Sequence, residues 1–105
     1  MKIIISAVVL TLIGFTGSAM AADADKGKEV FNANCGTCHS GGKNAMAAGK
    51  SLSKEDLETN KMNSAAAITG LVTNGKTPMP AFDKLGANDI ENVAAYVLKK
   101  ADAGW

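Results

Sequence analysis

The stretch "NANCGTCHSGG" at residues 32–42 contains both cysteines and the only histidine of this 105-residue chain. These three strong ligands for soft metals all fall between Cys35 and His39, in the pattern C-x-x-C-H. Cysteines at this spacing occur in three kinds of site: a redox disulfide, part of a zinc site, and the covalent attachment of a haem. The choice among the three decides which fold the other residues can form.

A disulfide or a zinc ion accounts for only part of the pattern. A redox-active C-x-x-C pair normally begins a helix that follows a strand in a βαβ unit, whereas the residues before Cys35 have a helical pattern. A structural disulfide suits an exported protein but leaves His39 unexplained. A structural zinc ion needs four ligands, usually from two pairs, and the motif supplies three.

Haem attachment uses all three side chains. Two thiols about one helical turn apart reach the two vinyl groups of a porphyrin and form thioethers, and the adjacent imidazole then lies beneath the ring, where it binds iron. The motif therefore predicts one haem c, held by Cys35 and Cys38 and ligated by His39.

The N-terminal segment has the pattern of a secretory signal peptide. Lys2 provides a positive start, an apolar run extends over residues 3–15, and small residues follow at Ala19 and Ala21. This matches an A-x-A cleavage site, and the apolar run is too short to span a bilayer. We expect cleavage after Ala21 and an exported domain of residues 22–105, with a retained membrane anchor as the less favoured alternative.

The composition of that domain narrows the classes of function. Once Lys2 is removed, ten lysines balance ten acidic residues, and the chain has no arginine. A nucleic-acid-binding surface needs a basic face, so this class is excluded, and without a second anchor the domain is expected to be soluble. A domain this small buries a modest fraction of its surface, and its apolar content is rich in alanine. A covalent haem supplies the missing core.

The remaining patterns predict an all-α domain of short helices and loops. A first helix is expected over about residues 24–34, with Asp23 and Asp25 at its positive end. A second is expected to begin near Lys54, where Ser53 and Asp56 have the spacing of a capping box.

Two further helices are expected in the second half of the chain. Ser64 and Gly75 delimit the third, with Ala65, Ile68 and Val72 along one of its faces. Asn88 is expected to cap the last helix, whose apolar residues repeat at helical spacing. These residues are Ile90, Val93, Ala94, Val97 and Ala101.

The chain has no second histidine, so a methionine is the natural candidate for the second axial ligand of the iron. Within residues 22–105 the methionines are Met46, Met62 and Met79, and methionine is ordinarily a core filler. Met79 stands between two prolines in "TPMP", which stiffen the backbone and favour an extended conformation. We therefore expect Met79 to be the ligand.

Residues 22–105 resemble cytochrome c6, the small photosynthetic family of the class I cytochromes c. The resemblance rests on "ADADKGKEVFNANCGTCHSGG", "NGKTPMPAF" and "NDIENVAAYVLKKADAGW". It implies the class I cytochrome c fold, with four short helices and loops around one covalently bound haem. It also implies thioethers at Cys35 and Cys38, and His39 and Met79 as the axial ligands.

The resemblance carries further expectations about residues. Asn44 and Lys50, together with Leu52, are expected to lie along the haem. Gly27 and Phe31 match positions at which the first helix crosses the last, near Tyr96.

The implied function is that of a soluble one-electron carrier, not an enzyme, working between cytochrome f of the b6f complex and photosystem I. The implied compartment is the thylakoid lumen, with the bacterial periplasm as the alternative. Two other functions stay open: a periplasmic donor to a terminal oxidase, and a haem-based ligand binder with an open axial site.

Three departures from the family pattern are expected to matter. Leu71 stands where a glutamine is common near the haem, and an apolar neighbour changes the reduction potential. Lys84 replaces an arginine associated with docking and loses the planar fork of guanidinium. Ala48 stands where a proline is usual, and together these changes suggest a divergent or auxiliary member.

Overall fold

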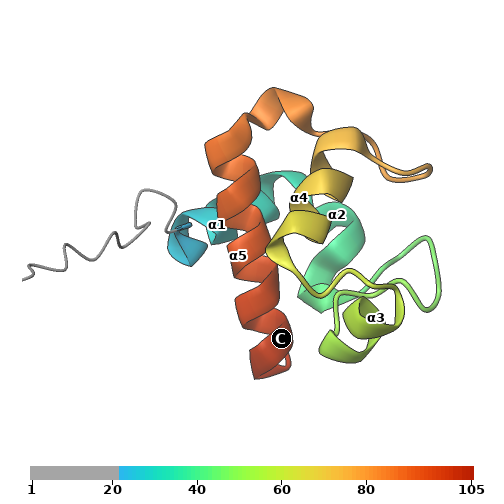
Figure 1. Cartoon of the computed structure of the whole chain (residues 1–105). Helices are drawn as coiled ribbons and strands as arrows, with labels where there is room; N and C mark the ends of the chain where they lie inside the picture. The colour runs from blue at the N-terminus through green and yellow to red at the C-terminus, as the bar shows by residue number, and fades with distance from the viewer. Residues whose placement is uncertain (1–21) are drawn as a thin grey trace, which may run out of the picture.

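A computed structural model describes residues 22–105, and the predicted signal peptide with its cleavage site lies outside the described residues. The described chain is helical and contains no strand, which confirms the expected all-α class. None of its helices has the length and apolar character needed to cross a bilayer. The elements are α1 (Ala24–Asn34), α2 (Gly36–His39), the 3₁₀ turn η2 (Ser40–Gly42), α3 (Lys54–Thr59), α4 (Ala65–Asn74), the 3₁₀ turn η3 (Asp83–Leu85) and α5 (Ala87–Ala103). Figure 1 shows α1 crossing the long α5, with α4 and α3 on the other side of α5.

The crossing of α1 and α5 is the central contact of the fold, and it depends on a glycine. A Cβ atom at Gly27 would lie 1.9 Å from the backbone oxygen of Asn92 and 2.9 Å from Cβ of Tyr96. The backbone N–H of Asp23 donates to Oδ1 of Asn92 at 2.8 Å, and the ring centroids of Phe31 and Tyr96 are 5.2 Å apart. The expected crossing of the first and last helices near Tyr96 is confirmed.

The hydrophobic core lies between α5 and the other helices. All five apolar residues that repeat at helical spacing in the last helix are buried, as are Ile68 and Val72 of α4. Ala65, which the sequence predicts on the same face as Ile68 and Val72, is in contrast exposed. It is the first residue of α4, and its neighbours from Asn63 to Ala66 are all exposed. The beginning of α4 therefore lies outside the core.

The capping box predicted before α3 is half formed. The hydroxyl of Ser53 accepts the N–H of Asp56 at 3.1 Å, as expected. The Asp56 carboxylate does not return the bond; it accepts the hydroxyl of Ser51 at 2.6 Å and the N–H of Ser51 at 3.2 Å. Ser51 offers the carboxylate two donors, whereas a complete capping box would offer only the N–H of Ser53. This explains why the Asp56 carboxylate bonds to Ser51.

The last helix begins earlier than predicted. Asn88 lies inside the first turn of α5, and the preceding Gly86 takes the cap position with φ 83° and ψ 158°, with no capping side chain among the described residues. Only glycine adopts such a conformation readily. It lets the chain turn directly from η3 into α5, and the N–H of Ile90 donates to the Gly86 carbonyl at 3.1 Å. The prediction of Asn88 as the cap was therefore wrong.

The cap of α4 provides a test of this local structure. The hydroxyl of Ser64 accepts the N–H of Ala67 at 3.1 Å. Replacing Ser64 with alanine removes that acceptor and is expected to lower the free energy of unfolding of the haem-loaded protein by about 1 kcal/mol. Ser64→Asp keeps an acceptor and should stay close to the unmutated protein. Guanidinium unfolding followed by circular dichroism measures both, and an equal loss in the two variants would contradict the capping role.

Candidate functional site

The C-x-x-C-H motif forms a compact turn at the end of α1. Cys35 ends α1, and its N–H donates to the Phe31 carbonyl at 2.8 Å. The Cys35 carbonyl then accepts the N–H groups of Cys38 at 3.2 Å and His39 at 2.9 Å, which closes the single helical turn α2. This turn adds to the four helices that the sequence predicts. It places two thiols and an imidazole on one short, hydrogen-bonded segment.

The two cysteines have different surroundings. No disulfide joins them; Cys38 is exposed, whereas Cys35 is partly buried and packs against the hydrophobic core. Burial raises the pKa of the Cys35 thiol to about 11. The thiolate is the reactive form in disulfide chemistry, so a thiol with this pKa is poorly suited to redox exchange at neutral pH.

The zinc alternative also lacks support. In the part of the chain that the structure describes, no three His, Cys, Asp or Glu side chains come together in a way that would hold a metal ion. A closed structural zinc site requires four such ligands.

His39 is oriented by a backbone carbonyl. Its Nδ1 atom lies 2.9 Å from the carbonyl oxygen of Lys43. Because a carbonyl only accepts, Nδ1 carries the proton and donates it, and Nε2 keeps its lone pair. Histidines that bind metals almost always donate their second ring N–H in this way, which fixes the tautomer and the ring orientation. His39 is therefore prepared to bind a metal through Nε2.

Met79 lies in a turn that two backbone hydrogen bonds close. Its N–H donates to the Lys76 carbonyl at 2.7 Å, and its carbonyl accepts the Lys76 N–H at 3.0 Å. Gly75, at φ 70°, lies so close that a Cβ there would be 2.9 Å from the Met79 carbonyl oxygen. Met79 is half-buried and packs against the core. The backbone stiffness predicted from the flanking prolines is thus reinforced by hydrogen bonds.

The other two methionines have different positions. Met46 is 66% exposed, in the loop that follows α2. Met62 is partly buried against the core, and its N–H donates to the Leu57 carbonyl at 2.7 Å. Met62 has the surroundings of a core filler, the ordinary role of methionine.

Asn44 and Lys50, which the resemblance places along the haem, organise the loop of residues 43–52. Oδ1 of Asn44 accepts the N–H groups of Met46 and Ala47 at 2.9 and 3.0 Å, and its amide donates to the Lys50 carbonyl at 3.1 Å. The Lys50 ammonium donates to Oδ1 of Asn60 at 2.7 Å. Both residues therefore hold the loop in shape.

Asn60 is a residue of this region that the sequence analysis missed. It ends α3, and its amide donates to the carbonyls of Gly49 at 2.9 Å and Asp56 at 2.8 Å. It thereby ties the loop to α3. An asparagine after a short helix is a known helix-ending signal, but its link to Gly49 depends on the three-dimensional path of the loop.

The parts of the candidate site belong to one side of the fold. Figure 1 shows the loop around residues 75–81 and the loop of residues 43–52 extending toward the same side of the helices, with α2 between them. Cys35, Leu52 and Met79 all pack against the same hydrophobic core. Of the departures from the family pattern, Leu71 is partly buried, whereas Lys84 and Ala48 are exposed.

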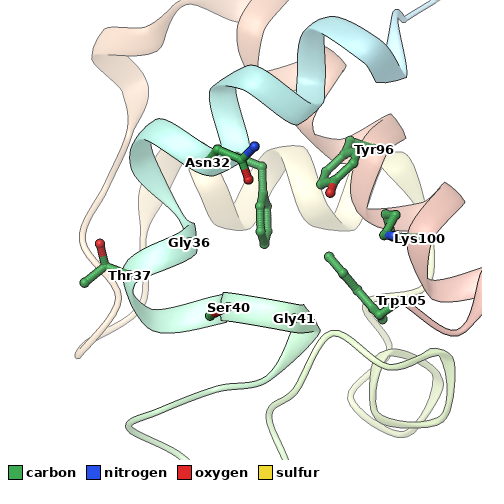
Figure 2. A pocket seen from close by; sticks show the side chains of 9 residues that line it. Asn32, Gly36, Thr37, Ser40, Gly41, Tyr96, Lys100 and Trp105 are labelled. Carbon is green, nitrogen blue, oxygen red and sulfur yellow. The ribbon is translucent and has the colours of Figure 1, made fainter.

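A separate hollow of ≈ 490 Å³ lies behind the attachment turn. Figure 2 shows Tyr96 and Lys100 of α5, with Trp105 beyond them, facing Asn32 and the segment from Gly36 to Gly41. Neither His39 nor Met79 lines this hollow. The candidate site is therefore defined by the attachment turn and the two loops; the hollow shares Gly36 and Thr37 with that turn but neither of the two predicted iron ligands.

Comparison with known proteins agrees with this arrangement. Residues 22–97 match the family described as "Cytochrome C oxidase, cbb3-type, subunit III". Cytochrome c6 of Porphyra purpurea is 49% identical, with 100% of this chain and 96% of the relative covered. The crystal structure of cytochrome c6 from the diatom Phaeodactylum tricornutum matches with a TM-score of 0.76 at 44% identity, covering 80% of this chain and 100% of that one. Cytochrome c6C from Synechococcus sp. PCC 7002 matches with a TM-score of 0.75 at 40% identity, covering 77% and 100%.

The site residues fit the cofactor of these relatives. Two thiols and an imidazole with a free Nε2 occupy one turn, which is the donor set that covalent haem attachment requires. The chain therefore belongs to the cytochrome c6 family of electron carriers and has one covalently bound haem c.

Proposed function

We propose that Cys35 and Cys38 would hold the haem through thioethers and that His39 and Met79 would be the ligands of its iron. The observation that carries this proposal is the hydrogen bond from His39 Nδ1 to the Lys43 carbonyl, because it leaves Nε2 available as a ligand. The closed turn around Met79 is the supporting observation. When bound, the haem supplies an iron that takes up and releases one electron.

The protein's own contribution is to keep the ligands in place in both oxidation states. Backbone hydrogen bonds hold the turn that carries His39 and the turn that carries Met79. Little rearrangement is then needed when an electron arrives or leaves. Ligation by a methionine thioether and a histidine imidazole raises the reduction potential of the haem iron. The Lys43 carbonyl makes the imidazole more basic, which lowers that potential.

For the physiological role, we propose electron transfer from cytochrome f of the b6f complex to photosystem I, after export to a thylakoid lumen or a periplasm. Encounters of this kind use small, short-lived interfaces. The equal numbers of lysines and acidic residues in residues 22–105 give little net charge for steering. Two of the lysines have local partners, since Lys50 bonds to Asn60 and Lys54 pairs with Asp102 at 3.7 Å.

A second candidate role is donation of electrons to a terminal oxidase in a periplasm. It is favoured by the family that matches residues 22–97, whose description names a subunit of a cbb3-type oxidase. Leu71 stands where the family has a glutamine, and an apolar neighbour changes the reduction potential of the haem. A lower potential would favour donation to an oxidase.

A redox titration with a carbon monoxide test examines the proposal. The purified haem-loaded protein should titrate as a single one-electron couple, with a slope of about 59 mV per tenfold change in the ratio of oxidised to reduced protein. The reduced protein should not bind carbon monoxide readily, because both axial positions are filled. Ready binding would contradict the carrier proposal in favour of an open site. A potential well below that of cytochrome f would contradict donation to photosystem I and favour the oxidase.

A further inference from the structure

The C-terminal residue, Trp105, folds back onto the body of the protein. The N–H of Gly104 donates to the Ala101 carbonyl at 3.2 Å, and the N–H of Trp105 donates to the Lys100 carbonyl at 2.8 Å. This pair of bonds is the Schellman arrangement that ends many helices. Trp105 itself has a φ of 62°, which is uncommon for a bulky side chain. The hydrogen bond of its N–H and the contacts of its side chain therefore keep Trp105 in this conformation.

The indole ring makes two specific contacts with the segment that follows α2. Its Nε1–H donates to the Leu52 carbonyl at 2.7 Å. Its face covers Gly42, where an added Cβ would lie only 2.4 Å from a ring atom. On the other side, the centroids of Phe31 and Tyr96 lie 5.4 and 6.0 Å from the indole. Trp105 thus clamps Gly42 and Leu52 against the α1–α5 crossing.

A series of backbone hydrogen bonds connects Gly42 and Leu52 to the imidazole of His39. The carbonyl of Gly42 accepts the N–H of Leu52 at 2.7 Å, and the N–H of Lys43 donates to the Ser40 carbonyl at 3.2 Å. The peptide unit between Gly42 and Lys43 is therefore held at both of its polar atoms. The next carbonyl along the chain is that of Lys43, which accepts Nδ1–H of His39.

We propose that Trp105 is a positioning residue for His39. By covering Gly42 and holding Leu52, the indole keeps the Gly42–Lys43 peptide in the orientation that aims the Lys43 carbonyl at the imidazole. The part of this inference that concerns the reduction potential rests on the proposed role of His39 as an iron ligand. A weaker bond to the carbonyl makes the imidazole less basic, so loss of the indole should disfavour oxidised iron and raise the potential.

The test compares Trp105→Ala and Trp105→Phe with Val97→Ala in the haem-loaded protein. Val97 is a core residue of α5 that is 4% exposed, and it makes neither of the hydrogen bonds that join Leu52 to Gly42 and to Trp105. Exchange of the His39 Nδ1 proton is followed by NMR in the reduced protein, and the potential is measured by titration. Trp105→Ala should speed exchange by about tenfold, the effect of losing one hydrogen bond, and raise the potential. Trp105→Phe keeps a ring over Gly42 and should change both in the same direction, but less.

The control distinguishes positioning from general loss of stability. Val97→Ala should destabilise the fold but leave both the exchange rate and the potential unchanged. Equal changes in Val97→Ala and Trp105→Ala would overturn the proposal, as would unchanged exchange in both Trp105 variants. Faster exchange with an unchanged potential would support the positioning by Trp105 and contradict His39 as the iron ligand. Trp105→Phe preserves the test if Trp105→Ala does not fold.

Discussion

Replacing Gly27 with alanine is expected to lower the free energy of unfolding of the haem-loaded protein by about 3 kcal/mol, the upper part of the range for overpacked sites. The new Cβ would fall 1.9 Å from the backbone oxygen of Asn92 and 2.9 Å from Cβ of Tyr96. Backbone atoms of a buried helix cannot move aside as a flexible side chain does, so α1 and α5 must separate. That separation also opens the contact between Phe31 and Tyr96. In a domain of this size the melting temperature should fall by more than about 10 °C.

A matched control is available in α4. Gly70 is also a helical glycine, but nothing lies within 4 Å of the position that its Cβ would take. Gly70→Ala should therefore stabilise the protein by about 0.5–1 kcal/mol, because alanine favours the helix over glycine. Guanidinium unfolding of both variants measures the two effects. The close approach of α1 and α5 would be refuted by stabilisation in both variants, since helix propensity alone would then explain the result.

The sequence predicted those helices whose ends are marked by nearby residues. Ser64 and Gly75 delimit α4, and the apolar repeat from Ile90 to Ala101 identifies the buried face of α5. The failures arise where two residues compete for the same role. Gly86, not Asn88, begins α5 because its positive φ connects the helix to the preceding turn. Spacing alone does not decide which of two such residues caps a helix, because the outcome depends on the direction in which the preceding chain enters it.

The candidate site shows the same limit more clearly. The order of Cys35, Cys38 and His39 predicts the kind of cofactor, because the chemistry of attachment lies within one turn of the chain. The orientation of His39 depends on the Lys43 carbonyl. Every residue has a backbone carbonyl, so residue types alone do not identify the one that accepts this bond. The contact of Trp105 with Leu52 joins residues that are distant along the chain. Such partners are determined by the path of the loops, so they are found only in the folded structure.

Replacing Met79 with alanine is expected to open one face of the iron. The proposed ligand is lost, whereas the turn closed by the backbone of Lys76 and residue 79 keeps its hydrogen bonds because they do not involve the side chain. The reduced variant should bind carbon monoxide readily. If the thioether occupies the iron for ~99% of the time, the unmutated protein should bind this gas ~100-fold more weakly than the variant. The potential should also fall, because methionine ligation raises it.

The other methionines are the controls for this prediction. Met46→Ala alters a largely exposed side chain, and Met62→Ala alters one that packs against the core. Neither should increase the affinity for carbon monoxide, although Met62→Ala should lower stability through the cavity that it leaves. Spectrophotometric titration of the three reduced variants with the gas measures the affinities. If Met62→Ala or Met46→Ala opened the iron and Met79→Ala did not, the ligand would have been assigned to the wrong loop. The stiff turn around Met79 would then serve only to shape the surface there.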